Sequence, residues 1–226
     1  MNTDVRVAVV GGGIVGASVL YWLAKMGWGD AILLERRELT SGSTWHAAGN
    51  TTYFGPYPAM TRLFAGSIRT YLQAENDSGH SISFHQTGGL RLAATMRELE
   101  LFHLYKERYD ELDIPFYIRS PAETKQLNPL IDTGRIFGAA HTPTDGHVDP
   151  TGATNALAKA ARILGAQVER FRPVDALYQN KDHWVLETEK GNISAQHVVI
   201  AASFWARELM APLGLNLPLY ATQHHE

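Results

Sequence analysis

The stretch "VRVAVVGGGIVGAS", residues 5–18, decides the fold of this chain. Residues 5–10 form a short, nearly continuous apolar run rich in valine, which is typical of a buried parallel strand. The apolar residues that follow the glycines recur at helical spacing, and Gly27 is a natural helix stop. A second apolar run, "AILLE" at 31–35, follows at once. This β-α-β order predicts a right-handed crossover and a parallel sheet, as in a Rossmann-like α/β domain.

The glycines match the pattern G-x-G-x-x-G through Gly11, Gly13 and Gly16. The first glycine allows a tight turn, the second lets a pyrophosphate approach the backbone, and the third lets the helix pack on the strand. Free amides at the helix start, around Ile14 and Val15, favour phosphate groups. Glu35 ends the second strand about twenty residues later, where an acid binds the adenosine ribose. The context predicts a dinucleotide site.

Composition narrows the functional classes. The chain has 226 residues, 45% of them hydrophobic, a formal net charge of −3 and no cysteine. Disulfides, thiolate metal sites and thiol nucleophiles are excluded, and no metal site is expected. Scattered charges and the lack of a long apolar run argue against nucleic-acid and membrane partners. A strand so close to the first residue leaves no room for a leader peptide, so a cytoplasmic location is expected.

The remaining patterns predict an α/β domain that is interleaved with an α+β insertion. Residues 1–80 are expected to be the first part of the nucleotide-binding domain, 81–145 the insertion and 146–226 the second part. A hairpin is expected at 81–94 and a helix at 95–113, where Thr95 and Glu98 form a capping box. Further along, we expect a helix from Pro150, a β-meander at 174–195 and a buried strand at 197–202.

The loop after Glu35 distinguishes between dinucleotides. It is rich in small residues that suit close packing along a long flavin nucleotide: Gly42, Ser43, Thr44, Ala47, Ala48 and Gly49. The segment "LTSGSTWHAAGNTTYF" (39–54) resembles the dimethylglycine dehydrogenase and sarcosine dehydrogenase family of flavoproteins, which has a D-amino-acid-oxidase-like fold. Supporting matches are "FHQTGGLRLA" (84–93), "DGHVDP" (145–150), "HVVIAASFWARE" (197–208) and "PLYATQHHE" (218–226).

The resemblance implies FAD as cofactor and roles for several residues. His46 corresponds to the histidine that binds covalently to a methyl carbon of the flavin ring. His224 corresponds to the active-site histidine beside the substrate. Further cofactor contacts are implied for Arg36, Val174, Ala202 and Trp205. Ser203 departs from the family, which usually has glycine there, and its side chain could either crowd the phosphates or donate to them.

The implied reaction is oxidative demethylation of an N-methylated glycine such as dimethylglycine or sarcosine. Hydride passes to the flavin, which oxygen or an electron-transfer flavoprotein reoxidises. Tetrahydrofolate enters only if a further carboxyl-terminal domain exists. The chain is expected to be the amino-terminal part of such an enzyme and to be poorly active alone. Two alternatives remain: a non-catalytic regulatory protein like the pyruvate dehydrogenase phosphatase regulatory subunit, and, less well supported by the loop, a nicotinamide-dependent dehydrogenase.

Overall fold

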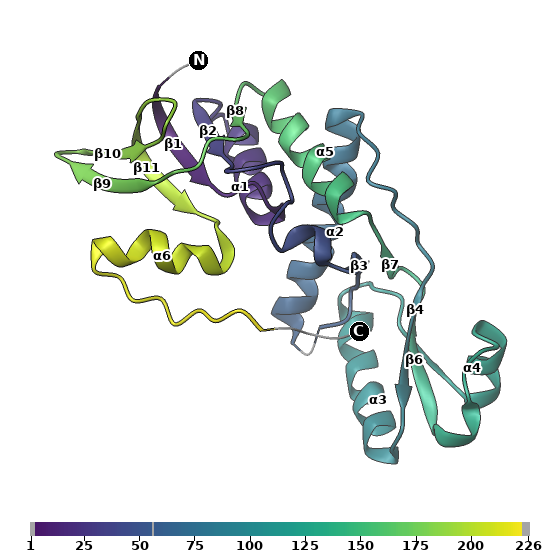
Figure 1. Cartoon of the computed structure of the whole chain (residues 1–226). Helices are drawn as coiled ribbons and strands as arrows, with labels where there is room; N and C mark the ends of the chain where they lie inside the picture. Colours follow the sequence, from purple (N-terminus) through teal and green to yellow (C-terminus); the bar gives the residue numbers. More distant parts are fainter. Residues whose placement is uncertain (1–2, 56, 223–226) are drawn as a thin grey trace. The chain divides into compact units, whose positions relative to one another are not determined.

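The computed structural model describes residues 3–55 and 57–222, which divide into two compact units. The first unit contains residues 1–47, 71–82 and 149–226, and the second contains 48–70 and 83–148. Residues 48–70, which fall inside the segment 1–80 expected to belong to the first domain, thus group with the second unit. Helix α2 (Pro58–Ser78) contributes residues to both units. Figure 1 shows the elements in sequence colours.

A six-stranded sheet with the order β8-β2-β1-β11-β10-β9 organises the first unit. Its parallel part consists of β8 (Gln167–Glu169), β2 (Ala31–Leu34), β1 (Asp4–Val10) and β11 (Ile193–Ile200). The strands β10 (His183–Glu187) and β9 (Ala176–Asn180) extend it antiparallel. The parallel pairing of β1 with β2 and the meander were therefore both predicted correctly.

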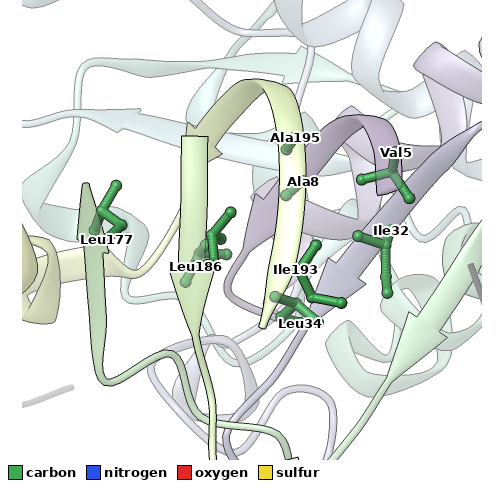
Figure 2. Packing of buried hydrophobic residues seen from close by; sticks show 9 residues of the cluster. Val5, Ala8, Ile32, Leu34, Leu177, Leu186, Ile193 and Ala195 are labelled. Carbon is green, nitrogen blue, oxygen red and sulfur yellow. The ribbon is translucent and has the colours of Figure 1, made fainter. Parts of the chain in front are cut away.

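The core of the first unit runs across this sheet. Figure 2 shows the buried side chains of this cluster spread across the sheet, from Leu177 to Ile32. Leu34, Leu186 and Ile193 are each at most 1% exposed. Leu209 of α6 (Ala206–Met210) and Leu213 of the 3-10 helix η4 (Ala211–Leu213) pack against the same cluster. Burial of these aliphatic side chains is the main favourable term in the folding of this unit.

Helices α1 (Ile14–Lys25) and α5 (Pro150–Ile163) lie side by side in Figure 1 and contact each other closely. Their buried positions are mostly small, including Ala17 in α1 and Ala156 and Ala160 in α5, which lets the two backbones approach. The carboxylate of Asp149 caps α5 by accepting from the amides of Thr151 and Gly152, so the predicted helix start at Pro150 is confirmed.

The second unit combines a three-stranded antiparallel sheet, in the order β4-β6-β5, with two helices. The strands are β4 (Gly89–Ala93), β5 (Tyr117–Arg119) and β6 (Gly138–Thr142). The helices are α3 (Met96–Glu111) and α4 (Pro121–Leu127), and both begin with a complete capping box. Short pieces complete the unit: β3 (Asn50–Thr51), β7 (Gly146–His147) and the 3-10 helix η2 (Thr133–Arg135). The α+β character predicted for the insertion is confirmed.

One local prediction was wrong, and another was right only in part. The hairpin at 81–94 does not form: only β4 is a strand, and its antiparallel partner is β6, about fifty residues later. Residue 85 instead makes an isolated bridge to residue 147. The strand expected at 197–202 is the second half of the long β11, and its residues 198–200 are half-buried rather than buried. No helix in the described part of the chain is both long and apolar enough to cross a membrane.

Candidate functional site

A cavity of about 900 Å³ opens in the first unit at the carboxyl ends of β1, β2 and β11. This volume lies toward the upper end of ligand pockets, which range over about 300–1,000 Å³. Its wall is formed by the glycine turn, the ends of the three parallel strands, the loop at 42–47, residues 173–175 and α6. Ligands of open α/β sheets bind at this carboxyl edge.

The glycine turn is shaped by contacts that leave no room for side chains. Gly11 has φ +112°, and a Cβ there would overlap the carbonyl oxygen of Ala201 at the end of β11. A Cβ on Gly16 would overlap the carbonyl oxygen of Gly11, so this glycine lets the helix pack on the turn and does not itself line the cavity. Gly12, at a variable position of the motif, is also constrained, though by side chains rather than backbone, because its Cβ would lie 2.8 Å from the Cβ of Glu35.

The first turn of α1 faces the cavity with unsatisfied amides. The amide of Ile14 donates to the hydroxyl oxygen of Thr44 over 3.1 Å, while the N-cap Gly13 has no side chain to supply a cap. Within the described residues, no group accepts from the amides of Gly13 or Val15. These donors and the positive end of the helix dipole favour an anionic group at this point.

Glu35 is held at the end of β2 by two backbone amides. One carboxylate oxygen accepts from the amide of Gly12 over 2.6 Å, and the other accepts from Arg37 over 2.9 Å. The residue is only 9% exposed, yet it lines the cavity. Each carboxylate oxygen has a second lone pair. Glu35 can therefore accept hydrogen bonds from the hydroxyls of a bound ribose without losing its structural bonds.

Buried Arg172 supports this end of the cavity and was missed by the sequence analysis. Its backbone amide donates to the carbonyl oxygen of Glu35 over 2.8 Å. Its guanidinium, in a residue 2% exposed, donates to the hydroxyl of Thr188 and the carbonyl oxygen of Gly191. It anchors the segment that continues into the lining residues Pro173–Asp175. A single arginine after a short strand gives no sequence signal for such a role.

The Trp205 side chain forms part of the cavity wall and lies next to Arg36 and Gly42, two other residues that the sequence predicted as cofactor contacts. The guanidinium of Arg36 lies 4.0 Å from the centroid of its ring. A Cβ on Gly42 would lie 3.2 Å from the Trp205 ring edge, so a small residue is needed at that position. These contacts bring the end of β2, the loop at 42–47 and the segment after β11 together on one wall.

Ser203 takes up a left-handed backbone conformation, with φ +54°. This region favours glycine, which explains physically why glycine suits the position. Its hydroxyl oxygen lies 3.2 Å from that of Ser43, within hydrogen-bonding distance. Both serines also line a second, smaller cavity of about 430 Å³ that includes Phe204 and residues 219–222.

His46 ends the short 3-10 helix η1 (Thr44–His46), beside the cavity wall. Its neighbours Thr44 and Ala47 line the large cavity, whereas His46 itself is exposed and is not among the lining residues. The Trp45 and His46 rings lie with centroids 3.8 Å apart at an interplanar angle of 34°. The imidazole is thus open to a neighbouring group on its solvent side.

Most of the predicted cofactor residues meet at this cavity. The lining includes Gly11, Gly13, Ile14, Val15, Glu35, Arg36, Gly42, Ser43, Thr44, Ala47, Val174, Ala202 and Trp205. Gly16 and His46 adjoin it, Ala48 and Gly49 belong to the second unit, and His224 lies outside the described residues. Sequence reasoning missed several lining residues, among them Gly12, Asp175, Glu208 and Leu209. Of these four, only Gly12 had a sequence signal, since it lies inside the glycine motif.

Comparisons with known proteins agree with this architecture. The chain is 41% identical over 217 residues to dimethylglycine dehydrogenase of Rattus norvegicus, and 35% identical over 231 residues to human sarcosine dehydrogenase. It is 34% identical over 227 residues to the mouse pyruvate dehydrogenase phosphatase regulatory subunit. These matches cover 96%, 99% and 99% of the chain but only 25%, 25% and 26% of the relatives. The chain thus spans about a quarter of their length.

Among solved structures, L-proline dehydrogenase from P. horikoshii superposes with a TM-score of 0.85 at 29% sequence identity. The match covers 95% of this chain and 57% of that one. The protein family described as FAD dependent oxidoreductase matches residues 6–225, nearly the whole chain. With the fold and the glycine-lined cavity, this match identifies the chain as a member of the FAD dependent oxidoreductase family.

Proposed function

We propose that the chain binds FAD in the large cavity and forms the flavin-binding part of an oxidoreductase that acts on N-methylated amino acids. The observation that carries this proposal is the alignment, along one cavity, of Glu35, the open amides of α1 and the small-residue loop at 42–47. Glu35 would bind the adenosine ribose and the α1 amides the pyrophosphate. Bound flavin would supply hydride acceptance from the substrate carbon next to nitrogen.

The substrate class rests on the relatives. Dimethylglycine and sarcosine dehydrogenases are named for small N-methyl amino acids, and both cover almost all of this chain. His224 would lie beside the amine and accept a proton from its ammonium form, because only the neutral amine gives up hydride readily. A histidine suits this role because its ordinary pKa is near neutrality. The electron acceptor would be oxygen or an electron-transfer flavoprotein.

We also propose that His46 attaches covalently to the flavin. An imidazole nitrogen would form a bond to the methyl carbon of the flavin ring, with loss of the imidazole proton and one methyl proton. The two electrons would pass to an oxidant such as dioxygen. The exposed imidazole, in a loop whose neighbours line the cavity, supports this assignment. Histidine is also the available common nucleophile for such a bond, since the chain has no cysteine.

The test is denaturation of the purified chain in acid, followed by in-gel flavin fluorescence and intact mass. We expect a fluorescent band and a mass increase of FAD less two hydrogens, and both should disappear in His46→Ala. His80→Ala is a matched control, because His80 lies outside the cavity lining and should leave the adduct intact. A flavin adduct that still forms in His46→Ala, with the same increase in mass, would contradict attachment at His46.

One relative favours a second candidate. The pyruvate dehydrogenase phosphatase regulatory subunit shares 34% identity, so a regulatory role on the same fold is a competing proposal. Anaerobic addition of dimethylglycine or sarcosine to the flavin-loaded full-length protein separates the two. Bleaching of the visible flavin absorbance indicates catalysis. A bound flavin that neither substrate bleaches favours the regulatory function.

A further inference from the structure

The turn after β11 carries a serine where the backbone favours glycine. Ser203 has φ +54°, a conformation that costs an ordinary residue free energy relative to glycine. Among the described residues, its hydroxyl pairs with that of Ser43 over 3.2 Å. Both residues are exposed, so this hydrogen bond replaces hydrogen bonds to water and adds little to folding stability. Stability alone therefore does not account for the side chain.

The position of the two hydroxyls suggests another role. Ser43 and Ser203 line the large cavity and also the smaller one of about 430 Å³, so the pair lies where the two cavities share a wall. Ser43 directly precedes Thr44, which accepts from the first amide of α1. Ser43 is thus the chain neighbour of a residue that is hydrogen-bonded to the helix start, the element that favours phosphate.

Hydroxyl groups can rotate to suit a ligand. When two hydroxyls form a hydrogen bond, one donates its proton to the other. The accepting hydroxyl still has its own proton, which it can donate to a third group. A phosphate oxygen only accepts, and hydrogen bonds to it are stronger than those between neutral groups. An arriving phosphate would therefore draw one or both protons toward itself.

We propose that the hydroxyls of Ser43 and Ser203 together form a donor pair for the pyrophosphate of the bound dinucleotide. This inference rests on the proposed function, and it adds a contact that glycine at position 203 would lack. The strained serine would be kept because its hydroxyl contributes to cofactor affinity.

The decisive variant is Ser203→Gly, because the proposal predicts effects of opposite sign on stability and affinity. Relief of the positive φ should leave the melting temperature of the full chain unchanged or raise it. Loss of the hydroxyl should weaken binding of FAD and ADP by about threefold to tenfold. The measurements are made in a His46→Ala background so that FAD binds reversibly. Adenosine, which has no phosphate, should bind equally well to both proteins.

Three comparisons complete the test. Ser43→Ala should weaken FAD binding similarly, and its combination with Ser203→Gly should cost less than the sum, because the hydroxyls act as a pair. Ser41→Ala, an exposed serine of the same loop, should change nothing. Unchanged FAD and ADP affinity in Ser203→Gly would overturn the inference. Failure of the unsubstituted chain to bind FAD would instead overturn the proposed function and the inference with it.

Discussion

At the residue scale, the glycines of this chain differ sharply in what surrounds them. A Cβ on Gly16 would overlap a backbone carbonyl oxygen, which cannot move without opening the turn. A Cβ on Gly66, inside α2, would have only the end of the Arg69 side chain as a neighbour, 3.9 Å away. The same substitution should therefore have opposite effects at these two sites.

We expect Gly16→Ala to lower the free energy of unfolding by about 1–3 kcal/mol, because the added methyl group must displace backbone. Gly66→Ala should raise it by about 0.4–1 kcal/mol, because alanine favours the helix and restricts the unfolded chain. Urea denaturation followed by circular dichroism measures both changes. Equal effects of the two substitutions would show that the turn does not have the tight packing described here.

At the element scale, α1 and the carboxyl-terminal part of α2 are joined by a polar cluster. The Lys25 ammonium lies 2.7 Å from the Asp77 carboxylate, and the Tyr21 hydroxyl donates to the same oxygen over 2.7 Å. The hydrogen bond from Lys25, followed by that from Tyr21, lowers the pKa of Asp77. The hydrogen bond to Asp77 in turn raises the pKa of Lys25.

The signs of these shifts predict how stability depends on pH. A depressed Asp77 pKa stabilises the fold above the usual aspartate pKa of about 4, and this contribution disappears as the pH falls through the lower, folded-state value. The raised pKa of Lys25 stabilises the fold below about pH 10.4 and is lost at higher pH. Asp77→Asn should therefore lose more stability at pH 7 than at pH 2. Asp110→Asn, which affects an exposed pair with Lys106, is the control. An equal loss for Asp77→Asn at both pH values would refute the assignment.

The elements also show what could be predicted from sequence. Thr95 and Glu98 predicted the start of α3, because capping depends on residues three apart. The hairpin at 81–94 was wrong because the partner of β4 lies about fifty residues away in β6. A local pattern of alternation indicates a strand but does not identify its partner.

At the scale of the whole molecule, the β-α-β opening and the meander build a single sheet whose carboxyl edge forms the cavity. The glycine motif and Glu35 predicted the position of this cavity, because their spacing along the chain places both at the carboxyl ends of neighbouring parallel strands. The contribution of α6 through Glu208 and Leu209 could not be predicted, since the sheet places that helix there and no local motif marks it. The grouping of residues 48–70 with the second unit likewise depends on long-range packing.

The central claim, that this cavity binds FAD, is tested most directly by titrating flavin-free His46→Ala protein, in which FAD binds reversibly, with FAD and following flavin fluorescence. The variants below are made in the same background. We expect saturable quenching with one FAD per chain. Glu35→Gln should bind roughly tenfold or more weakly, because an amide cannot accept from both Gly12 and Arg37 and leaves a buried donor unpaired. Glu38→Gln, at an exposed neighbouring acid, should bind like the unsubstituted chain. A folded chain that shows no saturable change, or a Glu35→Gln variant with unchanged affinity, would contradict the account.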